Sequence, residues 1–153
     1  MFYSLLIALH LLGAIVWVGG MFFATLVLRP AAVVLEPHER LVLFSKVFPR
    51  FFRWVWISLI AIVVSGYWVV FGIYGGFANV GGHVHIMQAS GLVMVALFMF
   101  LYFVPFRRFE LAVAANDMIA AGKHMAAIRG IVTTNLILGL ATSALGAARV
   151  YWG

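Results

Sequence analysis

The sequence predicts an all-α fold: an integral membrane bundle of four helices with both termini on the extracytoplasmic side. Of its 153 residues, 66% are hydrophobic and only 9% are charged, a composition outside that of water-soluble domains. Four apolar segments are long enough to cross a hydrocarbon core of roughly 30 Å, which takes about 20 helical residues. We therefore expect residues 1–153 to form a single domain in a lipid bilayer.

The four expected spans cover approximately residues 2–28, 52–74, 85–104 and 127–152. Each should be a helix, because an open strand leaves backbone polar groups unpaired in lipid and the segments lack the alternation of an outer-membrane barrel. The first run lacks a basic region before it and a small-residue cleavage site after it, and it is longer than the core of a signal peptide. We therefore expect it to be a retained span.

The two longer connections carry most of the charged residues. Residues 31–50 predict a short helix that is broken at Pro37 and closed by Pro49. Residues 106–127 mix charges with apolar residues at helical spacing, which suits a segment lying along the membrane surface.

Nine of the ten Lys and Arg residues belong to these two connections or their flanks. They are Arg29, Arg40, Lys46, Arg50, Arg53, Arg107, Arg108, Lys123 and Arg129. The positive-inside rule then makes both connections cytoplasmic and both termini extracytoplasmic. The chain is predicted to be a multi-pass protein of the bacterial inner membrane, and its formal charge of +6 is explained without a nucleic-acid partner.

The remaining composition narrows the chemistry to His, Met and bound cofactors. The chain has no cysteine, which excludes disulfides, thiolate metal sites and cysteine nucleophiles. Its four acidic residues, Glu36, Glu39, Glu110 and Asp117, all lie in the cytoplasmic connections. This placement argues against paired-carboxylate catalysis or a proton-coupled relay inside the membrane.

His10 is the most informative residue of the first span, because an ionisable side chain in a span is costly unless it faces the bundle interior. Spacings of three and four place it on one face with Gly13, Trp17, Gly20 and Ala24. Such a seam could admit a flat cofactor. Alternatively, the glycines let the fourth span approach and His10 only forms a hydrogen bond between helices. The matching small residues of that span are Gly139, Thr142, Ser143 and Gly146.

The stretch "GGHVHIMQ", residues 81–88, brings two imidazoles and a thioether close together. If it is extended, His83, His85 and Met87 point the same way and offer a ligand set suited to copper, especially Cu(I). If it is helical, residues two apart diverge by about 200°, so one histidine faces the bundle and the other solvent. In a third interpretation the histidines are interfacial and Met87 only fills space.

The string "HLLGAIVWVGGMFFATLVLRP", residues 10–30, resembles the first span of the copper-resistance protein D (CopD) family. It is also similar to the first span of the HemJ-type protoporphyrinogen oxidases. By this resemblance His10, Trp17, the pair Gly19 and Gly20, and Arg29 match the histidine, tryptophan, glycines and arginine of the family pattern. Both groups are small multi-span bacterial membrane proteins, and the wider group is associated with b-type haem.

The third span departs from the HemJ pattern, in which a lysine shortly follows an early histidine. Here His85 is followed by Ile86, Met87 and Gln88, and no lysine lies in any expected span. The departure favours the copper-resistance branch over protoporphyrinogen oxidation.

Combined with the resemblance, these residues predict a haem b protein. His10 and His85 would be the axial ligands, Gly13 would give clearance, Trp17 would pack against the porphyrin and Arg149 would pair with a propionate. The expected role is one-electron redox at the outer face of the inner membrane, in which the haem exchanges electrons with a quinone or a periplasmic carrier as a haem-dependent oxidoreductase.

Other functions remain open from sequence. One is copper transport or resistance through an outer site of His83, His85 and Met87, with copper in place of haem. Another is HemJ-type activity. For the assembly of the protein, the alternatives are a homo-oligomer and an accessory subunit of a larger respiratory complex.

Overall fold

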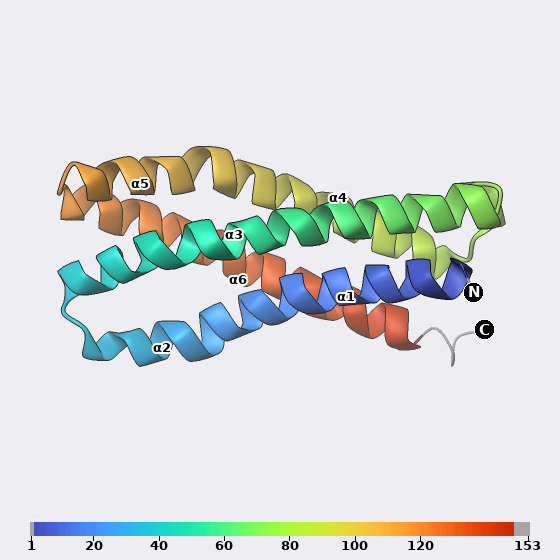
Figure 1. Ribbon diagram of the computed structural model, residues 1–153, viewed down its shortest axis with the longest axis horizontal. Helices are drawn as coiled ribbons and strands as arrows, with labels where there is room; N and C mark the ends of the chain where they lie inside the picture. Colours follow the sequence, from blue (N-terminus) through green and yellow to red (C-terminus); the bar gives the residue numbers. More distant parts are fainter. Residues whose placement is uncertain (1, 149–153) are drawn as a thin grey trace.

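The computed structural model describes residues 2–148, which form helices joined by short turns with no strand among them. Figure 1 shows four long helical rods side by side. The rods are Tyr3–Val34, Pro37–Ile73, Gly82–Ala114 and Met118–Ala148, and each is long and apolar enough to cross a membrane. The predicted all-α, four-helix membrane fold is therefore confirmed.

Several rods contain a local change of helix type. In chain order the elements are α1 (Phe2–Phe23), a π-helical turn (Ala24–Leu28), α2 (Arg29–Ala31), a 3-10 turn (Ala32–Val34), α3 (Pro37–Trp68), a π-helical turn (Val69–Ile73), a 3-10 turn (Phe77–Asn79), α4 (Gly82–Leu101), a π-helical turn (Tyr102–Phe106), α5 (Arg107–Ala114) and α6 (Met118–Ala148). Pro105 lies in the third π-helical turn, where irregular hydrogen bonding accommodates a residue without an N–H.

Residues 31–50 differ from the prediction, because no helix ends at Pro49. Pro37 occupies the first turn of α3, where a missing N–H costs little, and the helix then continues through Pro49. Pro49 is exposed on the outer face, while Phe48 and Phe52 on the opposite face stack with ring centroids 5.4 Å apart. Packing of that aromatic face outweighs the one lost hydrogen bond.

Residues 106–127 also differ from the prediction of a segment along the membrane surface. They form a helical hairpin, in which α5 continues the third rod and α6 begins after a sharp turn (Figure 1). Asn116 adopts a positive φ of 56° at the turn, and the Asp117 carboxylate accepts a 2.9 Å hydrogen bond from the Ala120 N–H. Phe109 and Ala121 are fully buried, so this part of the segment packs against protein.

The four rods pack chiefly as two pairs. Helix α1 lies along α3, and α4 lies along α6, while α1 also contacts α6. We call the end where α1 begins and α6 ends the terminal end, and the end with residues 35–36 and 115–117 the basic end (Figure 1). All the Lys and Arg residues within 2–148 lie toward the basic end. The orientation in the bilayer stays a prediction.

Aromatic side chains fill the bundle from its middle to the basic end. Phe52 contacts Phe98 and Phe106 with ring centroids 5.7 and 4.8 Å apart, and Trp17 contacts Phe98 edge-on at 6.1 Å. These rings pack in the offset and edge-to-face geometries that aromatic pairs favour. In the described terminal half the rings of Tyr67, Phe71 and Phe77 also contact one another, but Phe71 is exposed, and the cavity described below lies in this half.

The hairpin at the basic end gives a direct stability test. Phe109→Ala should lower the free energy of unfolding by about 3–5 kcal/mol, because it leaves a cavity at a fully buried position. Leu111→Ala is the matched control on the same helix, since Leu111 is 70% exposed. Chemical unfolding in detergent should separate the two variants, and an equal loss of stability in both would contradict the buried hairpin.

Candidate functional site

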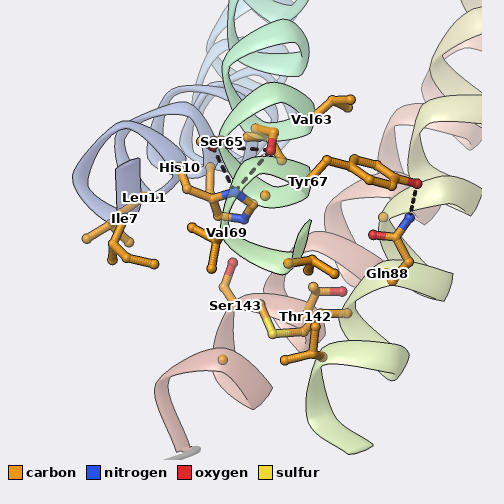
Figure 2. Close-up of a pocket in the computed structure, with 18 of the residues that line it drawn as sticks. Ile7, His10, Leu11, Val63, Ser65, Tyr67, Val69, Gln88, Thr142 and Ser143 are labelled. Carbon is orange, nitrogen blue, oxygen red and sulfur yellow. Dashed lines mark hydrogen bonds between the residues drawn. The ribbon is translucent and has the colours of Figure 1, made fainter. Parts of the chain in front are cut away.

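A cavity of about 630 Å³ lies between the two helix pairs in the terminal half of the bundle. Its wall is mostly apolar and comes from α1, α3, α4 and α6 (Figure 2). A few polar or sulfur-bearing side chains also line it: Tyr3, His10, Ser65, Tyr67, Tyr74, His83, Met87, Gln88, Met94, Thr142 and Ser143. An apolar wall with few convergent polar groups is the usual composition of a ligand site.

His10 contributes a ring nitrogen whose protonation is fixed by its neighbours. Its Nδ1 lies 3.1 Å from the Ile62 carbonyl oxygen and 3.1 Å from the Ser65 Oγ (Figure 2). A carbonyl oxygen can only accept, so Nδ1 must carry the hydrogen and donate it. In the neutral imidazole the Nε2 lone pair is then free, and Figure 2 shows this second nitrogen on the side of the ring away from Ser65. His10 is thus prepared as an electron-pair donor toward the cavity.

Two glycines allow this arrangement. A Cβ at Gly66 would lie 3.2 Å from the His10 Cε1, and a Cβ at Gly13 would lie 2.9 Å from the Ile62 side chain. Both positions therefore bring α1 and α3 close together. The predicted seam of α1 does face the interior, but its glycines meet α3 and not the fourth span. Gly139 of α6 instead packs against Val18 and Met94.

Residues 81–88 are helical and not extended, because α4 begins at Gly82. His83 and Met87 lie one turn apart on the same face, and both line the cavity. His85 does not line it; its ring is exposed and lies 5.9 Å from the Phe77 ring. His83, His85 and Met87 therefore do not form the ligand set expected of an extended stretch. The cavity is instead lined by His83 and Met87 of α4 and, from the other helix pair, by His10 of α1.

This placement also changes the predicted axial pair. His10 and His85 do not share the cavity, since residues two apart on a helix diverge by about 200°. The second imidazole at the cavity is His83. A Cβ at Gly81 would lie 2.8 Å from the His83 Cε1, so the glycine before α4 gives the ring room to fold against the backbone.

Met87 is held by contacts with α6. Its Cε would lie 3.0 Å from a Cβ at Gly146, so the thioether packs where the glycine leaves space. The Thr142 hydroxyl donates to the Ser90 Oγ at 2.8 Å, and Ser90 donates to the Met87 carbonyl at 3.1 Å. This chain fixes the backbone of Met87 relative to α6.

Some cavity residues were missed by sequence reasoning. The Gln88 amide donates to the Tyr67 hydroxyl across α4 and α3 (Figure 2). Below the cavity, the Asn135 amide donates to the Met94 carbonyl at 3.2 Å, and its Oδ1 is buried without a partner. The sequence does indicate Ser65 and Asn135 as interior residues, because a polar residue inside a span usually faces the bundle.

Arg149, the predicted propionate partner, lies outside the described residues 2–148. Within that range no cluster of three or more His, Asp or Glu side chains could hold a metal ion. A metal site at this cavity would therefore also need ligands other than these three residue types, and the Met87 sulfur lines the cavity.

Comparison with known proteins bears on the spans that carry His83 and Met87. The family model described as Copper resistance protein D (CopD) matches residues 45–149, which include most of α3 and all of α4, α5 and α6. No curated protein and no solved structure matches the chain. The similarity to HemJ-type enzymes stays a prediction. A match over more than half of a multi-pass membrane chain shows that this protein belongs to the CopD family.

Proposed function

We propose that the protein binds cuprous copper in the cavity, through His10, His83 and Met87, as a step in copper resistance. The observation that carries the proposal is the helical start of α4, which places His83 and Met87 on the face that lines the same cavity as His10. Membership of the copper resistance protein D family supports the choice of metal.

The ligand chemistry suits this ion. Thioether and imidazole groups are the soft and intermediate ligands that select Cu(I). Thioether and imidazole groups coordinate a metal in their neutral forms, so the bound ion keeps a single positive charge, which is the smallest charge a metal can bring into an apolar site. The hard divalent cations Ca²⁺ and Mg²⁺ would need the carboxylates that the cavity wall lacks among the described residues.

The Nδ1 hydrogen bonds of His10 support its role as a ligand. A metal-binding imidazole normally donates its other N–H to a carbonyl or a carboxylate, which fixes the tautomer and orients the ring. Ile62 and Ser65 supply such acceptors on α3. His10 therefore needs no change of protonation or orientation before it binds.

The shape of the bundle implies a direction of access. The cavity lies in the terminal half, and the aromatic layer of Trp17, Phe52 and Phe98 closes the bundle beneath it. Copper would therefore enter from the terminal end. With the predicted topology, that end faces the extracytoplasmic side.

The α4 register gives the sharpest test of this site. His83→Ala and Met87→Ala should each weaken Cu(I) binding by at least about tenfold, because each removes a ligand. His85→Ala is the matched control, since its ring is exposed and outside the cavity. Competition with a coloured Cu(I) chelator under reducing, anaerobic conditions measures the affinities. A loss in His85→Ala equal to that in His83→Ala would refute the helical site.

The support of His10 by α3 gives a second test. Ser65→Ala leaves the Ile62 carbonyl as the sole acceptor for Nδ1, so Cu(I) affinity should fall by about tenfold, at the lower end of losses seen for supporting partners. Ser58→Ala is the control, because Ser58 is a buried serine of the same helix with no hydrogen bond to His10. If Ser65→Ala and Ser58→Ala bind Cu(I) with equal affinity, the hydrogen bond from His10 to Ser65 does not support copper binding.

Haem b remains a second candidate, because the cavity is large and both His10 and His83 line it. The fit is poorer than for copper: no Lys or Arg of residues 2–148 lines the cavity to pair with propionates. The reduced-minus-oxidised visible spectrum of protein from haem-replete cells tests it. We expect no b-type bands; a Soret band that disappears in His10→Ala would instead support the haem site and the one-electron role predicted from sequence.

A further inference from the structure

Three arginines from three rods converge at the basic end of the bundle. They are Arg29 of α2, Arg40 of α3 and Arg129 of α6. Arg29 and Arg129 line the same small hollow, and both Arg29 and Arg40 lie within range of electrostatic interaction with Arg129. Arg40 and Arg129 are half-buried, and within residues 2–148 no carboxylate pairs with any of the three. The fold therefore holds three like charges together without a counter-charge.

Two of these guanidinium groups have unused donors. The Nε atoms of Arg40 and Arg129 are buried from solvent and have no hydrogen-bond partner within the described residues. Arg40 uses only its Nη2, which donates to the Leu35 carbonyl at 3.2 Å. A buried N–H without an acceptor is unfavourable, particularly on a charged group. Both the charge and the free donors would be satisfied by an anion with several oxygen atoms.

A small hollow of about 30 Å³ lies beside the cluster. Arg29 and Arg129 line it together with two hydroxyl residues, Thr25 and Thr133. The rest of its wall is apolar and includes Phe44, Phe48, Met125 and Ile128. The hollow is too small for a phosphate group. It shows that Arg29 of the first rod and Arg129 of the fourth lie against the same space.

We propose that Arg29, Arg40 and Arg129 bind a phosphate group, supplied either by the headgroup of an anionic phospholipid or by a phosphorylated solute. Phosphate matches this set because its oxygens accept several guanidinium hydrogen bonds at once and its charge offsets the repulsion. In the predicted topology the basic end meets the cytoplasmic leaflet, where anionic lipids are present.

The general preference for basic residues on the cytoplasmic side does not account for this cluster. Basic side chains that are exposed to solvent satisfy that preference. Four arginines at this end are exposed: Arg50, Arg53, Arg107 and Arg108. Burial of Arg129 and Arg40 beside Arg29 opposes stability unless a ligand compensates.

The test compares ligand-dependent stabilisation of the full-length protein and its variants. The thermal unfolding midpoint is measured in detergent with added phosphatidylglycerol, with phosphatidylcholine, with inorganic phosphate, and with chloride at equal ionic strength. The wild type should gain stability from phosphatidylglycerol or phosphate beyond the gain from its control. Phosphatidylglycerol alone identifies a lipid headgroup as the source, and phosphate alone identifies a solute.

The variants assign any gain to the cluster. Arg129→Gln and Arg29→Gln should lose at least half of it, whereas Arg108→Gln, an exposed arginine at the same end, should keep it. Without ligand, Arg129→Gln should unfold at the same or a higher temperature than wild type, because one like charge is gone. If Arg129→Gln does not fold, Arg40→Gln takes its place. Absence of any gain in the wild type, or an equal gain in Arg129→Gln and Arg108→Gln, would overturn the proposal.

Discussion

The hydrogen bonding of His10 to α3 is the constraint on which the terminal half of the structure depends. An imidazole inside a membrane bundle must find acceptors, and here they are the Ile62 carbonyl and the Ser65 hydroxyl. These contacts require α1 and α3 to approach closely, which Gly13 and Gly66 permit. The same contacts consume Nδ1 and leave Nε2 available. One interaction therefore joins a helix pair and orients the ring that we propose as a copper ligand.

The distribution of side-chain size along the bundle explains why the cavity lies at one end. Phenylalanines at 44, 48 and 52 of α3 and at 98, 106 and 109 of the third rod fill the space between the two helix pairs toward the basic end. In the terminal half the facing positions are small, such as Gly66, Gly91 and Gly146, and the pairs enclose a volume. Close packing in one half thus provides a floor for the other.

Composition and periodicity predicted the membrane class, the number of spans and the interior face of α1, because these follow from the cost of exposing polar groups to lipid. They did not predict where the helices end. Apolar length measures only the part in hydrocarbon, whereas α3 and α5 continue into the polar connections through packing of Phe48 and Phe109. Contacts between residues far apart in the sequence could not be predicted either. The hydrogen bond between His10 and Ser65, for example, depends on how α1 and α3 are rotated relative to each other.

Residues 81–88 show the same limit at the level of one residue. The glycine pair at 81 and 82 was compatible with either an extended strand or a helix start, and the choice decides which histidine meets the cavity. The structure places the helix start at Gly82, so His83 and Met87 share a face. His85 lies two residues from each of them and points away by about 200°. The proposed pair of ligands on α4 therefore depends on this stretch being helical.

The two ends of the bundle are linked by electrostatics. Nineteen residues of helix separate His10 from Arg29, or roughly 28 Å at about 1.5 Å per residue. At an effective dielectric constant of about 20, each arginine charge at that distance opposes a cation at the cavity by about 0.6 kcal/mol. A phosphate on the arginine cluster would offset this opposition. The proposed phosphate site and the proposed Cu(I) site are therefore weakly coupled, and each ligand would favour binding of the other.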